Sequence, residues 1–82
     1  MPKASAYILI KTIPGKEREV LKYLDEKLKT KHKELVFGGY DIVARVSAEN
    51  NEEIQKVVLE KVKSYTDVTG VLVLTCVKMP EK

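Results

Sequence analysis

Residues 36–46 read VFGGYDIVARV, so that two adjacent glycines and a Tyr-Asp pair separate two apolar runs. Gly38 and Gly39 adopt at little cost the positive φ angles that tight hairpin turns need, and the stretch therefore predicts a β-hairpin. Its strands are expected at residues 35–37 and 40–47. The turn also has a second interpretation, because its polar and aromatic residues suit a ligand site.

Two further strands are expected outside the hairpin, one near each end of the chain. Residues 6–12 (AYILIKT) are rich in β-formers and are followed by the turn residues Pro14 and Gly15. Residues 71–77 (VLVLTCV) form a similar run, which follows an expected helix break at residues 66–70. The hairpin strands thus have partners with which to form a sheet.

Two segments between the strands have the apolar spacing of amphipathic helices. The first covers residues 16–29, with Val20, Leu21, Leu24 and Leu28 on one stripe. The second begins at Asn50, with Glu53 three residues later in a spacing that resembles a capping box. Its apolar face contains Ile54, Val57, Val58, Val62 and Tyr65, and Leu59 lies off that face.

The order of these elements is strand, helix, strand, strand, helix, strand. Short connections and right-handed crossovers then predict an α+β fold, the ferredoxin-like βαββαβ plait. In this fold an antiparallel sheet carries two helices on one face. The length of 82 residues is expected to form a single domain, residues 1–82.

The strands do not alternate apolar with polar residues, as they would if the second face of the sheet met water. In the first strand Tyr7 and Leu9 point away from Ile8 and Ile10, and the last strand repeats this apolar-on-both-sides pattern. We therefore expect a homodimer in which two sheets pack face to face, a dimeric α+β barrel. Leu59 is either a stray surface leucine or part of a second interface that builds larger rings.

The chain is mildly basic, with a net charge of +3, and its lysines are interspersed with glutamates. Residues 27–33 (KLKTKHK) are the most basic stretch, but they include no aromatic residue for stacking. A solvated helix end and loop is the preferred interpretation of this stretch, with phosphate binding as the lesser alternative. Direct nucleic-acid binding is not expected. Lys11 and Arg45 form a possible basic spot on the sheet, or pair with carboxylates across a dimer.

One cysteine and one histidine cannot form an internal disulfide or a protein-only zinc site, so no metal or cofactor is expected. Cys76 is expected to be a small core side chain, and His32, among lysines, to be exposed. The N-terminus does not resemble a signal peptide, and no apolar run reaches membrane-spanning length. A cytoplasmic protein without membrane contact follows as the expectation.

The chain resembles the effector-sensing (RAM) domain of the Lrp/AsnC transcriptional regulators over about residues 6–77. The most specific matching pieces are Lys-Thr at 11–12 followed by Pro-Gly-Lys-Glu at 14–17, and Gly-x-Tyr-Asp at 38–41. The segments AYILIKTIPGKEREVLKYL, GGYDIVARV and EEIQKVVLEKV carry the rest of the resemblance. It implies a homodimer that assembles into octamers or similar rings and binds amino acids or related metabolites between subunits.

The sequence departs from this family in two places. The N-terminal helix-turn-helix is missing, so the chain is similar to stand-alone members, which act without direct DNA contact and by co-assembly with full-length regulators. Val71, Leu72 and Val73 stand where the family often has Ser or Thr near the effector. These aliphatic residues favour either a more apolar effector or the loss of amino-acid binding.

The predicted effector site consists of the turn residues Phe37, Gly38, Gly39, Tyr40 and Asp41. The Asp41 carboxylate suits the ammonium group of an amino acid, and the unshielded N–H groups of the two glycines suit its carboxylate. Tyr40 would wall the pocket and offer a hydroxyl, and Phe37 would supply an apolar side. In the alternative interpretation the glycines only make the turn, Asp41 bonds to nearby backbone N–H groups, and Tyr40 packs at an interface.

The leading functional hypothesis is a non-enzymatic, ligand-sensing oligomer that modulates the transcriptional regulation of amino-acid metabolism. The rival is a small dimeric α+β barrel enzyme of the monooxygenase or haem-handling type. It needs a polar cavity under the helices with a base or ligand histidine, for which His32 is the sole candidate. An ACT-like amino-acid-binding module is a third possibility.

Overall fold

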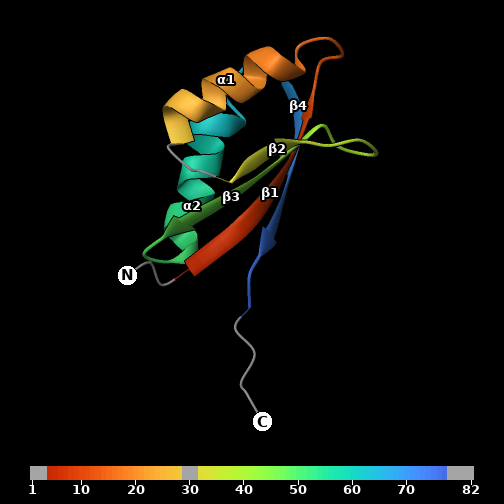
Figure 1. Ribbon diagram of the computed structural model, residues 1–82. Helices are drawn as coiled ribbons and strands as arrows, with labels where there is room; N and C mark the ends of the chain where they lie inside the picture. The colour runs from red at the N-terminus through yellow and green to blue at the C-terminus, as the bar shows by residue number, and fades with distance from the viewer. Residues whose placement is uncertain (1–3, 29–31, 78–82) are drawn as a thin grey trace.

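The structure is a computed structural model that describes residues 4–28 and 32–77. Its elements run in the order β1 (Ala4–Thr12), α1 (Glu17–Leu28), β2 (Lys33–Leu35), β3 (Ile42–Ala48), α2 (Asn51–Val57), η1 (Val58–Val62) and β4 (Val68–Thr75). The strands form one antiparallel sheet in the order β2-β3-β1-β4, with both helices on one face (Figure 1). The ferredoxin-like βαββαβ fold expected from the sequence is confirmed.

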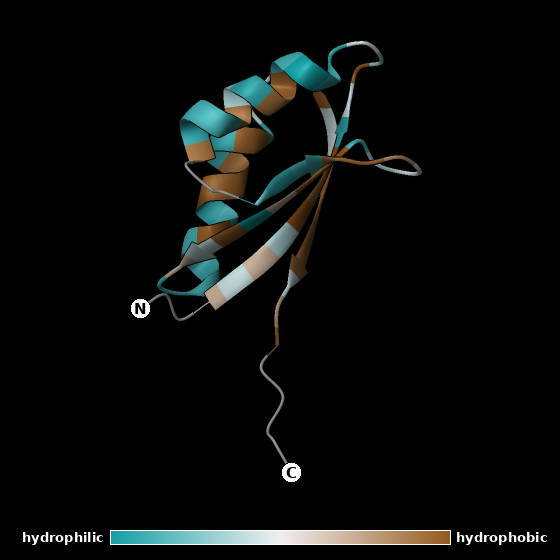
Figure 2. Cartoon of the chain, viewed as in Figure 1, coloured by the Kyte–Doolittle hydropathy of each residue, from teal (hydrophilic) through white to brown (hydrophobic). Residues whose placement is uncertain are grey.

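The core lies between the helices and one face of the sheet, where the apolar side of each element meets the others (Figure 2). In β1, alternate residues point into it, and Ile8 and Ile10 are fully buried. Val20 and Leu24 supply the buried stripe of α1, four residues apart as the 3.6-residue period requires. The remaining buried apolar residues are Ala6, Ile42, Ala44, Val46, Ile54, Val58 and Val62.

The second helix begins as expected and then departs from regular α geometry. The Asn50 side chain accepts a hydrogen bond from the Glu53 N–H at 2.8 Å, which confirms the predicted cap. The helix continues into a π-helical turn, η1, where the Lys63 N–H donates to the Val58 carbonyl at 2.9 Å. The sequence predicted one unbroken helix here, because apolar spacing does not distinguish a π turn from an α turn. Leu59 is exposed, as expected.

The hairpin differs from its prediction. The last pair of its ladder is Leu35 with Ile42, so that residues 36–41 form a longer loop in place of a two-residue Gly-Gly turn. Gly38 alone of the glycine pair has a positive φ, at 121°. The predicted strand ranges 35–37 and 40–47 were therefore wrong by one or two residues at each end. The Asp41 N–H bonds to the Ile10 carbonyl of β1, and only the Asp41 carbonyl, which accepts from the Val36 N–H, continues the hairpin.

The last strand also lies earlier in the sequence than predicted. β4 starts at Val68, because pairing with the end of β1 extends it through part of the expected break, and it stops at Thr75. Cys76 follows the strand, and its thiol is exposed. The prediction of a core cysteine was wrong, since the residue falls beyond the strand and on the side not covered by helices.

The basic stretch 27–33 is described in part. Helix α1 ends at Leu28, and residues 29–31 lie outside the described residues. His32 is exposed, as predicted. Lys33 opens β2 and forms an ion pair with Asp25 at 2.8 Å, which fixes the start of this edge strand against α1.

Candidate functional site

Residues 36–41, the hairpin loop, project beyond the sheet beside the end of β1 (Figure 1). The backbone N–H of Asp41 donates to the Ile10 carbonyl at 2.9 Å, and the N–H of Val36 donates to the Asp41 carbonyl at 2.8 Å. Lys11 Nζ donates to the Gly39 carbonyl at 3.3 Å. The loop is thus tied to the first strand by both backbone and side-chain hydrogen bonds.

The Asp41 carboxylate is held by one residue of β1. Its Oδ2 accepts from the Thr12 N–H at 2.9 Å and lies 3.4 Å from the Thr12 hydroxyl. Thr12 is buried, so this contact is shielded from water. Within residues 4–28 and 32–77, Oδ1 makes no hydrogen bond. The backbone contact considered for Asp41 from the sequence is therefore present, and one oxygen remains for a further contact.

A cavity of about 390 Å³, the loop cavity, lies beside the hairpin loop and the first turn of α1. The residues that line it are Glu17, Arg18, Leu35, Val36, Phe37 and Asp41. Of the predicted site residues, the structure brings Phe37 and Asp41 to this cavity, and Gly38, Gly39 and Tyr40 are outside its lining. Phe37 is fully exposed, at 105% of its reference surface.

The two glycines of the hairpin loop differ in whether the backbone conformation favours glycine at that position. A Cβ added at either position would meet nothing within 4 Å, so neither glycine is required by close packing. Gly38 is favoured by its backbone conformation, because L-residues with side chains rarely adopt a φ of 121°. Gly39 has no such requirement in the chain on its own.

The sequence did not predict four residues of the loop cavity, the apolar Leu35 and Val36 and the charged Glu17 and Arg18. Gly15 turns the chain with a φ of 90°, and this turn brings the start of α1 to the hairpin loop. The sequence signal was a pair of opposite charges in the first helical turn, which is common on any solvated helix. Only the fold shows that these charges and Asp41 share one cavity. Carboxylates, a guanidinium and an apolar wall together match the groups of an amino acid.

The face of the sheet away from the helices, the outer face, is not covered by any of the residues 4–28 and 32–77 that the structure describes. Its side chains form two rows across three strands, because β1 pairs with both β3 and β4. One row is Arg45, Tyr7 and Leu74, and the other is Val43, Leu9 and Leu72. Tyr7, Leu72 and Leu74 are 45%, 42% and 48% exposed. Such a contiguous apolar patch is unusual for a surface that stays in water.

The basic residues of the outer face contact their own neighbours. The Arg45 guanidinium lies 5.8 Å from the centre of the Tyr7 ring and donates to the Ser5 hydroxyl at 3.4 Å. Lys11 reaches the hairpin loop, as described above. The two cations therefore belong to separate local contacts, and the sheet has no shared basic spot at these residues.

The described ranges, 4–28 and 32–77, contain neither a metal-binding cluster nor a membrane-spanning helix. No group of three or more His, Cys, Asp and Glu side chains is placed to hold a metal ion there. No helix in this part of the chain is long and apolar enough to cross a membrane.

Solved structures with the same fold include transcriptional regulators of the AsnC family. FFRP-DM1 superposes with a TM-score of 0.83 and 26% sequence identity, over 90% of this chain and 99% of that chain. Escherichia coli AsnC superposes with a TM-score of 0.84 and 16% identity, over 96% of this chain and 54% of AsnC. In structure, the chain matches the Lrp/AsnC regulators. It spans about half of AsnC and nearly all of FFRP-DM1.

A third structure with this fold was solved with a ligand. It is a transcriptional regulator of Neisseria meningitidis in complex with L-Met, with a TM-score of 0.76 and 12% identity, over 98% of this chain and 53% of that chain. At such identity the likeness concerns the fold alone. No known family profile matches the sequence, and no curated protein is similar to it. The resemblance stated from the sequence is confirmed by the structures.

Proposed function

We propose that residues 1–82 form a non-enzymatic, ligand-sensing domain of the Lrp/AsnC type. The domain assembles through its outer face and binds an amino acid or a related small effector at the hairpin loop. It acts in the cytoplasm, where it modulates the transcriptional regulation of amino-acid metabolism by co-assembly with full-length regulators. The observation that carries the proposal is the uncovered apolar outer face, in a fold shared along nearly the whole chain with AsnC.

The energetics of the outer face support the assembly. A stable interface buries ~800 Å² per partner, which at about 25 cal/mol per Å² is worth ~20 kcal/mol per partner before the costs of association. A twofold axis places the same rows of Tyr7, Leu72 and Leu74 on both sides of the interface. Leu59, 62% exposed on the opposite layer, is available for the second interface that an octamer or a similar ring requires.

The loop cavity supports the effector site. In our proposal the Arg18 guanidinium binds the effector carboxylate, Asp41 Oδ1 accepts from its ammonium group, and Phe37 covers its side chain. Gly38, Gly39 and Tyr40 belong to the same loop and close over the ligand from outside the present lining. The Phe37 ring, which is fully exposed in the single chain, would pack against the effector side chain in this arrangement.

Effector binding and assembly are then linked by mass action. In our proposal a neighbouring subunit completes the effector site, so the ligand binds only the assembled form and stabilises it by RT ln(1 + [L]/Kd), which is ~2.7 kcal/mol at a hundredfold excess over Kd. This is enough to change the assembly state over a metabolite's ordinary range of concentration. The domain needs no chemical reaction to act as a sensor.

The test is a thermal-shift and native-mass screen with the twenty amino acids. We expect an amino acid with an apolar side chain to raise the melting temperature of the wild type. Asp41→Asn keeps an oxygen for Thr12 but removes the charge, and Arg18→Gln removes the guanidinium, so both should lose the shift. Lys22→Gln, one turn further along α1 and outside the cavity lining, is the matched control. Equal shifts in all four proteins would rule out the loop cavity as the site.

A further inference from the structure

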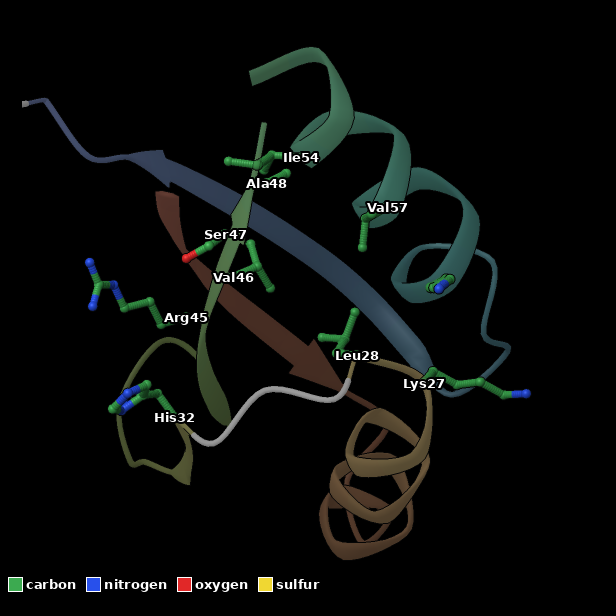
Figure 3. Close-up of a pocket in the computed structure, with 10 residues that line it drawn as sticks. Lys27, Leu28, His32, Arg45, Val46, Ser47, Ala48, Ile54 and Val57 are labelled. Carbon is green, nitrogen blue, oxygen red and sulfur yellow. The ribbon is translucent and has the colours of Figure 1, made fainter. Parts of the chain in front are cut away.

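A second and larger cavity lies under the helices, away from the hairpin loop (Figure 3). It has a volume of about 490 Å³ and sits between the end of α1, the second half of β3 and the α2–η1 segment. We call it the basic cavity; its lining residues are Lys27, Leu28, His32, Arg45, Val46, Ser47, Ala48, Ile54, Val57 and Lys61. Its size is within the ~300–1,000 Å³ range of small-molecule sites.

The lining divides into an apolar floor and a cationic rim. Val46 and Ile54 are buried at its base, and Val46, Leu28 and Val57 point into the space between the strand and the helices (Figure 3). Figure 3 also shows that the Arg45 and Ser47 side chains leave β3 on the opposite side. Arg45 therefore does not contribute its charge to the cavity, and the lysines of the lining are Lys27 and Lys61; no aspartate or glutamate is among the lining residues.

Lys27 and Lys61 are the lysines of this rim. Lys27 is in the last turn of α1, and Lys61 is in η1. Among residues 4–28 and 32–77, the ion pairs are Lys16 with Glu19 and Lys33 with Asp25, so neither rim ammonium is neutralised by a carboxylate there. Both lysines belong to the lining of one cavity, so its rim carries positive charge that a bound anion would offset.

The π-helical turn η1 is an independent observation at the same place. π turns inside helices are rare and occur frequently at functional sites. Val57 immediately precedes this one, and Lys61 lies within it. The irregular turn therefore coincides with the wall of the basic cavity.

We infer that the basic cavity binds an organic anion: a carboxylate or similar charged group on a compact apolar body. The charged group lies at Lys27 and Lys61, and the apolar body lies against Leu28, Val46 and Val57. Lysines act as point charges without the bidentate geometry of arginine, so the site selects for charge and an apolar body rather than for one planar head group. This site is separate from the loop cavity, and neither proposal depends on the other.

The test is a calorimetric titration of the full chain with octanoate. Saturable binding is expected, weakened ~2- to 5-fold by Lys27→Gln or by Lys61→Gln, as for partly exposed ion pairs. Val57→Glu, which places a carboxylate in the wall, should abolish it. Lys56→Gln and Lys63→Gln are the matched controls, because these exposed lysines flank the same segment outside the cavity lining.

Two further ligands separate the contributions of charge and apolar surface. Octan-1-ol has the apolar body without the charge, and inorganic phosphate has the charge without the apolar body, so both should bind more weakly than octanoate. Equal binding of either one would overturn the inference, as would equal losses in the rim variants and the control lysines. No saturable binding of octanoate to the wild type would also refute it. Circular dichroism of each variant verifies that it is folded.

Discussion

Replacing Leu74 by alanine should weaken the dimer that we propose the outer face forms. Leu74 is 48% exposed in the single chain, next to Tyr7 in the ladder of β1 and β4. Fully burying a leucine is worth ~1.5–3 kcal/mol, so covering the remaining half is worth ~1 kcal/mol per subunit. The residue occurs twice in a twofold interface, which gives ~2 kcal/mol and a ~30-fold higher dissociation constant for Leu74→Ala.

Sedimentation equilibrium over a range of concentrations measures this constant directly. Leu59→Ala is the matched control, because Leu59 is more exposed than Leu74, at 62%, but lies on the helical layer. We expect it to leave the monomer–dimer step unchanged while reducing any species larger than a dimer. The face-to-face arrangement would be contradicted if Leu74→Ala left the dissociation constant of the dimer unchanged. It would also be contradicted if Leu74→Ala and Leu59→Ala raised that constant equally. A wild type that is monomeric at micromolar concentration would contradict it as well.

Substitutions at Leu24, Asn50 and Gly38, two of them with a control, test the fold itself by urea unfolding. Leu24→Ala empties a fully buried position and should lower the free energy of unfolding by ~2–5 kcal/mol; a loss below 1 kcal/mol would mean that the core is not packed as described. Asn50→Ala removes the cap to Glu53 and should cost ~1 kcal/mol, whereas Asn50→Asp should retain most of it. Gly38→Ala should cost ~1–2 kcal/mol because of its positive φ, and Gly39→Ala, which meets open space, should cost much less; equal losses would refute the loop conformation.

The sequence predicted the elements whose signals are local. The apolar run of residues 6–12, the helical stripe of Val20 and Leu24, and the cap at Asn50 each depend on a few neighbouring residues. These signals were sufficient for the βαββαβ order and for the face of each helix that enters the core, whereas the strands, apolar on both sides, did not show which face the helices cover. The local signals do not depend on what the rest of the chain does.

The hairpin loop was predicted less well, because distant residues decide it. Asp41 bonds to Ile10 and Thr12, which lie some thirty positions earlier in the chain, and these bonds displace the tight turn that Gly38 and Gly39 suggest. The loop cavity could not be predicted for the same reason, because it depends on a contact between distant segments. No residue near position 37 indicates that the start of α1 lies beside the hairpin loop. Cys76 was misplaced because an apolar run does not show where a strand ends.

Lys11 and Thr12 are consecutive residues whose side chains leave β1 on opposite faces, yet both hold the hairpin loop. A displacement of that loop therefore reaches the outer face within one residue, without repacking the interior. In the proposed assembly, Lys11 and Thr12 of β1 would connect a bound metabolite at the hairpin loop with a neighbouring subunit on the outer face. An effector at the hairpin loop would thus lie, in that assembly, one residue of β1 away from the subunit interface.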